Sequence, residues 1–470
     1  LPERFLEWDN VVKIEHMGFR SNPFDAARKF LGYYGIQFTP LHMFISNIEN
    51  PLFLTLYCKT YRGDEAELPV LYDRLLENAN DKLHIKLARP IETAGYDQSD
   101  NIVLPIVEAL SKQALLTGKR QFEKDEIEAM PIWSTLGLAA RPFITQLIRE
   151  NILHDYELNG KNYVYFSFDQ MNDYFSAKTI ISMFQRKEEI RRYISENVLK
   201  IIDGKFENWG SEDLFAHICA LYAKKFGEEC IDIIQTINDE SARRDLFTIY
   251  IESFEWRNKI YLSISELLNL CNEYSVETST LWNAFISNSV KKDHLLNADV
   301  LHNVLKQYSL PKRDYLWTTF INERYLKDDR IVQLIELYSK GEELKISDHQ
   351  QIRLLLTLFS WILTSSNRWL RDTTSKAMIE ILKTHFAYTE YLLKNFSDVN
   401  DPYVIQRLYG VAFGACVKRN CENKEIFMAL VRFVFEEIFN TDNIYPDILL
   451  RDYARLIIER YMIEYPDELQ

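Results

Sequence analysis

The sequence is poor in the two residues that interrupt regular secondary structure. Its 470 residues include only 14 glycines and 13 prolines, well under average usage, while 47% of the chain is hydrophobic. A turn-rich or low-complexity chain needs many more such residues, so these classes are excluded. Few interruptions and ample apolar content predict a mainly α-helical protein with a large buried core.

Cysteine and histidine are scarce and scattered. The six cysteines form no C-x-x-C pair, and the nine histidines form no H-E-x-x-H. These absences argue against a metal site. We therefore interpret the cysteines as small buried hydrophobes in a reducing compartment, and we expect a cytoplasmic protein. They are Cys58, Cys219, Cys230, Cys271, Cys416 and Cys421.

Long apolar runs and positive charge are also lacking. The longest apolar run, residues 354–363, is about half the length that spans a bilayer, so it is interpreted as a buried helix and no membrane partner is expected. The formal net charge of −14 repels phosphate backbones, which makes direct nucleic-acid binding an unfavoured function for this surface.

No motif for catalysis is found along the chain. The P-loop pattern G-x-x-x-x-G-K-[ST], the kinase motifs and G-x-S-x-G are all missing. The nearest fragment, "LTGKRQ" from Leu116, lacks a glycine-rich loop and is better explained as the end of a helix. We expect that this chain alone catalyses no reaction.

Helix-start signals recur near the N-terminus. Residues 11–17 alternate apolar and polar side chains, which predicts one short strand. In "ENPLFLTLYCKTYRG", Asn50 is placed to cap a helix whose first residue is Pro51 and which ends near Gly63. Further helices are expected over residues 68–87 and 101–116.

A different pattern occupies residues 122–177. Two helices are predicted from "EKDEIEAM" and "LAARPFITQLIREN", and Asn159-Gly160 joins two alternating runs into a hairpin. Helix, helix and hairpin form the layout of a winged helix. Its second helix could read DNA through Arg141 and Arg149, but its mostly apolar neighbours favour intramolecular packing.

The stretch "YVYFSFDQMNDYFSA" changes from strand to helix near Asp169. As local structure, Phe166 and Phe168 are expected in a core strand, and Asp169 is expected to cap the helix. A functional interpretation can hold at the same time, in which the same junction is half of a site whose other half lies elsewhere.

After Ala177 the pattern is helix upon helix, and three segments align as repeats. Each has an arginine followed by an apolar helix, with steps of 36 and 44 residues between Arg371, Arg407 and Arg451. This spacing is typical of HEAT-type helix pairs. We predict that each arginine is substantially buried beside an aspartate, whereas surface ion pairs would contribute very little. The predicted ladder comprises Arg371, Asp372, Asp401, Arg407, Arg451 and Asp452, with Asp447 as a further partner.

Together, "NPLFLTLYC" and "FSFDQMNDYFSA" resemble the paired signatures of NACHT and related STAND signal-transduction NTPases. In that family the proline of a helical lid lies against adenine, and a winged-helix histidine reaches the β-phosphate of ADP. By this resemblance Asn50 and Pro51 belong to the lid element, and the nucleotide faces Phe168 and Asp169. Phe168 occupies the position of the family's histidine. Because a phenylalanine side chain cannot hydrogen-bond a phosphate, the resemblance does not extend to this phosphate contact. The other matching positions are Leu52, Phe166, Asn172, Asp173, Tyr174, Phe175 and Ala177.

The C-terminal repeats are similar to segments of bacterial antiviral STAND ATPases of the Avs type. The resemblance implies a P-loop core that holds ATP or ADP with Mg²⁺ and lies before Leu1, followed here by regulatory and sensor parts. Such a switch recognises a foreign protein and forms a homo-oligomer on activation. The alternative is a stand-alone helical-repeat scaffold without a nucleotide role. The expected parts are a core remnant (1–20), a helical lid (21–98), a winged helix (99–180), a helical linker or sensor (181–345) and HEAT-like repeats (346–470).

Overall fold

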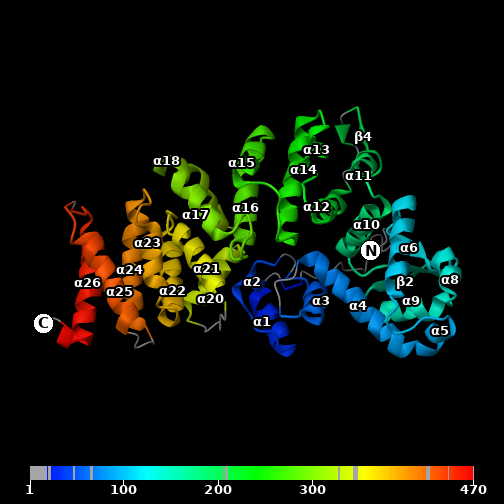
Figure 1. Ribbon diagram of the computed structural model, residues 1–470, viewed down its shortest axis with the longest axis horizontal. Coiled ribbons are helices and arrows are strands. Elements are labelled where there is room, and N and C mark those ends of the chain that lie inside the picture. Colours follow the sequence, from blue (N-terminus) through cyan, green and yellow to red (C-terminus); the bar gives the residue numbers. More distant parts are fainter. Residues whose placement is uncertain are drawn as a thin grey trace, which may run out of the picture.

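The computed structural model is mainly helical, as predicted, and its helices follow one another along an elongated, arched body (Figure 1). It describes residues 18–19, 23–45, 48–63, 67–203, 205–206, 210–326, 329–341, 348–419, 424–442 and 444–468. The strand predicted over residues 11–17 and the thiol of Cys421 lie outside these ranges.

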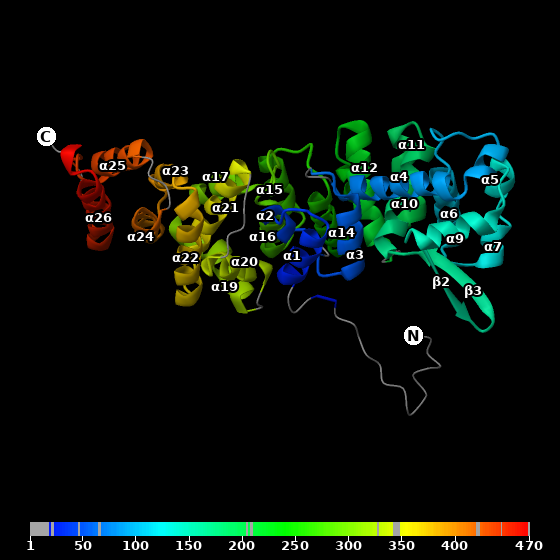
Figure 2. The ribbon, with the colours of Figure 1, turned by 90° about the horizontal axis from the view of Figure 1, so that it is seen from below.

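The first helices confirm the start signals in the sequence. Asn50 caps α3, and Pro51 is its first residue. α3 packs on α1 and on α4. The long helix α4 runs from the middle of the arch toward the end where α5 lies (Figure 2). These helices are α1 (Pro23–Tyr33), α2 (Pro40–Met43), α3 (Pro51–Thr60), α4 (Leu68–Lys86) and α5 (Ala88–Thr93).

The next part has the predicted winged-helix arrangement. Three antiparallel strands lie in the order β1-β3-β2, and helices α6 to α9 pack around them. Asn159 and Gly160 both have positive φ, 55° and 75°, as a two-residue hairpin turn requires. The elements are α6 (Val103–Thr117), β1 (Gln121–Glu123), α7 (Lys124–Glu128), α8 (Pro131–Leu136), α9 (Ala140–Arg149), β2 (Leu153–Leu158) and β3 (Lys161–Phe166).

α10 (Asp169–Met183) joins the winged helix to the remaining helices, because it packs on both α6 and α12. The chain then winds through helices and short turns. They are α11 (Lys187–Tyr193), η2 (Ile194–Val198), β4 (Ile201–Ile202), β5 (Lys205–Phe206), α12 (Glu212–Phe226), α13 (Ile231–Gln235), α14 (Glu240–Glu252), η3 (Ser253–Trp256), α15 (Ile264–Glu273), α16 (Thr278–Asn288), α17 (Ala298–Gln307), α18 (Leu310–Arg313), η4 (Asp314–Thr318), α19 (Thr319–Leu326), α20 (Arg330–Ser339) and α21 (His349–Ile362).

The C-terminal helices form a two-layered superhelix. In one layer, α20, α22, α24 and α26 pack successively side by side, while α21, α23 and α25 form the other layer. Asn367, Asp401 and Asp447 cap α22, α24 and α26, and each accepts a hydrogen bond from the amide three residues later. The remaining elements are α22 (Arg368–Thr384), α23 (Tyr388–Phe396), α24 (Pro402–Lys418), α25 (Lys424–Ile438), α26 (Ile448–Glu464) and η5 (Pro466–Glu468).

One continuous core runs through the described helices, from Phe24 to Tyr461. The apolar run at residues 354–363 is buried within and just after α21, as predicted. The five cysteines in the described ranges are buried, also as predicted. No helix in these ranges combines the length and the apolar character that crossing a membrane requires.

The N-terminal helices do not stand apart from the superhelix. In both views, α1 to α3 lie beside the middle of the arch, near α16, α20 and α21 (Figures 1 and 2). α2 packs on α21, and Arg330 at the start of α20 donates to the carbonyl oxygen of Ile45 at 3.1 Å. Arg330 also pairs with the carboxylate of Glu49. The segment just before α3 is therefore tied to a helix almost 300 residues further along the chain.

Candidate functional site

The start of α3 forms the first half of the candidate site. The side-chain oxygen of Asn50 accepts hydrogen bonds from the amides of Leu52 and Phe53, at 2.9 and 3.2 Å. Proline at the first helical position costs no hydrogen bond, because that amide would have no partner within the helix. The backbone amide of Phe19 donates to the backbone carbonyl oxygen of Glu49 at 2.8 Å, so residues 18–19 lie beside the turn that precedes α3. Pro51 is thus held in a fixed position at the rim of the N-terminal helices.

The junction between β3 and α10 forms the second half. The backbone remains extended through Phe168, with φ −132° and ψ 139°, and the helix begins at Asp169. The prediction that Asp169 is the N-cap is therefore wrong: Phe168 occupies that position. Asp169 is exposed, and its carboxylate faces Arg120 at 3.7 Å instead of the helix amides. The predicted core position of Phe166 is confirmed, since its side chain is buried.

Arg120, which no sequence motif indicated, contacts two carboxylates at this junction. Arg120 donates to both carboxylate oxygens of Asp173, at 3.1 and 3.2 Å. Burial raises the pKa of Asp173 to about 6, although the positive charge of Arg120 acts in the opposite direction. Arg120 follows the helix end at Gly118, which the sequence did reveal, but the distance of 53 residues to Asp173 conceals the pairing.

A partly buried polar cluster fastens α10 to the N-terminal helices. The hydroxyl of Tyr174 donates to a carboxylate oxygen of Asp73 in α4 at 2.8 Å, and Lys178 donates to the same oxygen at 2.6 Å. On the other side, the ring of His217 in α12 stacks on Trp256 with centroids 4.3 Å apart. Burial lowers the pKa of His217 to about 3, so this ring is neutral at physiological pH.

The structure does not bring the two halves of the candidate site together. α3 packs on α1 and α4 beside the middle of the arch, whereas α10 packs on α6, β3 and α12 (Figure 1). The junction also fits a phosphate poorly. Phe168 offers no hydrogen-bond donor, and the charge of Arg120 is already shared between Asp169 and Asp173. Pro51, by contrast, has the rigid apolar ring that a contact with a flat base requires.

The predicted arginine ladder is formed at one step. Arg407 of α24 pairs with Asp372 of α22 at 2.8 Å, and the two side chains are 27% and 40% exposed. Arg371 instead donates to the carbonyl oxygen of Ser365 at 2.7 Å, and Arg451 is exposed. The prediction of a buried arginine beside an aspartate is therefore wrong for Arg371 and Arg451.

Register explains why the ladder is incomplete. Arg371 and Arg451 lie four residues after their N-caps, Asn367 and Asp447, but Arg407 lies six residues after Asp401. Arg407 therefore points in a different direction from its helix than Arg371 and Arg451 do. Asp452, another member of the predicted ladder, pairs with Arg455 on the surface of its own helix at 2.8 Å.

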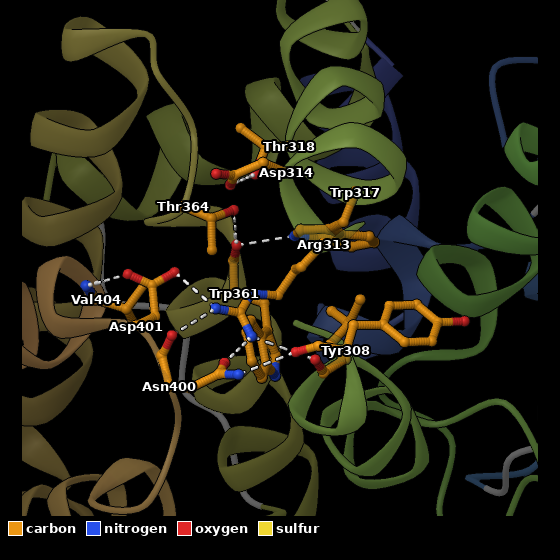
Figure 3. A network of polar contacts seen from close by, with 11 residues as sticks. Tyr308, Arg313, Asp314, Trp317, Thr318, Trp361, Thr364, Asn400, Asp401 and Val404 are labelled. Atoms are coloured by element: carbon orange, nitrogen blue, oxygen red, sulfur yellow. Dashed lines mark hydrogen bonds and ion pairs between the residues drawn. The ribbon is translucent and has the colours of Figure 1, made fainter. Parts of the chain in front are cut away.

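Asp401 has a different and fully buried partner. Arg313, whose side chain is 0% exposed, donates to the Asp401 carboxylate at 3.2 Å and to the side-chain oxygen of Asn400 at 2.7 Å (Figure 3). The guanidinium carbon of Arg313 also lies 5.2 Å from the centre of the Trp361 ring. The same aspartate caps α24, so one carboxylate joins two parts of the superhelix.

Comparison of the sequence with protein-family models and with curated proteins finds no match. Among the described residues, no group of three histidine, cysteine, aspartate or glutamate side chains is placed to hold a metal ion.

Proposed function

We propose that this chain is the regulatory and sensor portion of a nucleotide-dependent switch of the STAND type. The observation that carries the proposal is the double attachment of the N-terminal helices. Asp73 in α4 bonds to Tyr174 and Lys178 of α10, while Glu49 before α3 pairs with Arg330 of the superhelix. One small helical unit thus contacts both the winged helix and the proposed sensor.

The contacts that attach the N-terminal helices can be broken at a moderate cost in free energy. Lys178, Asp73, Arg330 and Glu49 are all partly exposed, and ion pairs between such groups stabilise a structure only weakly. A contact of this strength can be shifted by a ligand that binds one arrangement better than the other. Binding of a partner to the superhelix would then compete with its hold on α1 to α3.

In the fuller form of the proposal, the parent protein is a bacterial antiviral ATPase. Its P-loop core would hold ATP or ADP with Mg²⁺, HEAT-like repeats would recognise a foreign protein, and release of the N-terminal helices would permit oligomerisation. The packing of α20, α22, α24 and α26 in one layer supports the repeat part of this proposal.

The geometry of the junction favours the second candidate, a protein-binding scaffold without a nucleotide role. Phe168 cannot donate to a phosphate, and the carboxylates of Asp169 and Asp173 would repel one. The N-terminal strand that could distinguish the two candidates lies outside the described residues. Nucleotide binding therefore has to be tested directly.

The test is the change Pro51→Ala in the longer protein that contains a nucleotide-binding core. Loss of the apolar ring should weaken ADP binding about five- to tenfold in calorimetric titration, or roughly 1 kcal/mol. Pro402→Ala is the matched control, because Pro402 also follows a capping residue at the first position of a helix. Equal ADP affinity in all three proteins would reject the contact with Pro51 on which the nucleotide part of the proposal depends.

A further inference from the structure

Three successive helices expose a large apolar side chain at the same position. Trp369, Tyr403 and Leu449 are each the second residue of α22, α24 and α26, and they are 41%, 39% and 55% exposed. Because these helices pack side by side, the three side chains form a row across one edge of the superhelix. Neighbouring helix axes lie about 8–10 Å apart, so the row is roughly 20 Å long.

Arginines fill the spaces in this row. The guanidinium groups of Arg371 and Arg407 lie 5.1 and 5.4 Å from the centre of the Tyr403 ring. Arg371 comes from the neighbouring helix α22, whereas Arg407 belongs to α24, the helix of Tyr403 itself. Arg368 and Arg451 are exposed beside Trp369 and Leu449 in the sequence. Asp372, which pairs with Arg407 and Arg368, offsets part of this charge. Asp447 and Asp452 also lie beside Leu449 and Arg451 in the sequence, so the four arginines exceed the nearby aspartates by one, on a chain whose formal net charge is −14.

We infer that this arginine–aromatic edge, formed by Arg368, Trp369, Arg371, Tyr403, Leu449 and Arg451, docks an acidic polypeptide segment that also carries apolar side chains. Tryptophan, tyrosine and arginine are the residue types that contribute most to binding at protein interfaces. Guanidinium groups bind carboxylates through paired hydrogen bonds, and the apolar side chains between them would cover aliphatic groups of the partner.

Two observations favour a polypeptide over a nucleic acid. The net charge of −14 repels a phosphate backbone away from the edge itself. Ile448 and Leu449 also present aliphatic surface, which suits apolar side chains better than phosphates or sugars. An extended segment of about six to eight residues would span the row, at roughly 3.3 Å per residue. The inference rests on the protein-binding part of the proposed function and not on its nucleotide part.

The experiment measures fluorescence anisotropy with a labelled peptide of about ten residues that alternates glutamate and leucine. A glutamine–leucine peptide tests whether binding requires the carboxylates. A single-stranded oligothymidine with the same net charge as the acidic peptide tests whether the edge binds nucleic acid instead. The acidic peptide should bind saturably to the purified chain, and added salt should weaken it. Both comparison probes should bind at least about tenfold more weakly.

Charge reversal locates the binding surface. Arg368→Glu/Arg451→Glu should weaken the acidic peptide by about tenfold or more, since both side chains are exposed and neither holds the helices together. The control Arg89→Glu/Arg192→Glu makes the same change in net charge at exposed positions far from the edge, and it should change affinity less than about twofold. A normal melting temperature for each variant shows that the fold is intact.

Three results would overturn the inference: no saturable binding of the acidic peptide, an equal loss in the control variant, or tighter binding of the oligonucleotide. The outcome is separable from that of the nucleotide test. If the peptide binds and Pro51→Ala does not change ADP affinity, the nucleotide switch is rejected and the docking edge is retained. If Pro51→Ala weakens ADP binding but the peptide does not bind, only the docking edge is rejected.

Discussion

Arg313 joins two distant parts of the C-terminal half of the fold. It is completely buried, and its guanidinium reaches the carbonyl oxygen of Asn400 and the carboxylate of Asp401, 87 and 88 residues away. A buried arginine needs a carboxylate partner, as predicted, but Asp401 pairs with Arg313 and not with an arginine of the predicted ladder. Nothing in "LPKRDYLW" distinguishes a buried arginine from an ordinary polar loop, because the partners come from a distant repeat.

Arg313→Ala should lower the free energy of unfolding by about 3–5 kcal/mol, because the Asp401 carboxylate would remain buried without its partner. Arg407→Ala should cost under about 1 kcal/mol, since Arg407 and Asp372 are both partly exposed. Denaturant titration of the two variants measures the difference. Equal losses would show that the buried contact is no more important than the half-exposed one.

Asp173 should make stability depend on pH in an unusual direction. Its pKa is raised from 3.8 to about 6 by burial, so the folded protein binds this proton more tightly than the unfolded chain does. The contribution of Asp173 is therefore favourable below about pH 4 and is lost as pH rises through 6. Asp173→Asn should match the wild type near pH 4 and gain on the order of 1–3 kcal/mol by pH 8. A stability difference that does not change between these pH values would reject this assignment.

At the scale of helices and strands, local signals were sufficient. Pro51 after Asn50, Gly118 at a helix end and the Asn159-Gly160 turn each act within a few residues, and each was located correctly from the sequence. Asp169 was misplaced by one position because aspartate is favoured both at the N-cap and in the first helical turn. In the structure Asp169 takes the first helical position, and its carboxylate lies 3.7 Å from Arg120, 49 residues earlier in the chain.

The packing of α22 against α24 gives a prediction at the same scale. A Cβ atom at Gly414 would lie only 2.5 Å from Cδ1 and 2.9 Å from Cγ1 of Ile379, so Gly414→Ala should destabilise the fold by about 1–2 kcal/mol through overpacking. Gly32→Ala in α1 is the matched control. No atom of the described residues lies within 4 Å of its added Cβ, so higher helix propensity should stabilise by about 0.5–1 kcal/mol. Thermal unfolding that moved both variants in the same direction would contradict this helix contact.

On the scale of the whole molecule, the N-terminal helices connect the end that holds the winged helix to the middle of the arch. α4 and α10 meet through Asp73 and Tyr174, and α20 meets the turn before α3 through Arg330. The sequence predicted α3, α4 and α10 individually and α20 only as part of a run of helices. It did not predict these contacts, because Arg330 and Glu49 are separated by 281 residues. Long-range ion pairs leave no periodic pattern, whereas the helix faces that form the core do.

The central claim is that nucleotide and superhelix act on the same small unit, α1 to α3. Hydrogen exchange of the proposed parent protein with its nucleotide-binding core, measured with and without ADP, tests it most directly. At an ADP concentration about a hundred times Kd, amides of α3 should exchange up to about a hundredfold more slowly, while those at the start of α10 should change little. Arg330→Glu should speed exchange in α1 to α3 without affecting α22 to α26. Exchange in α3 that is unchanged by ADP would contradict the account.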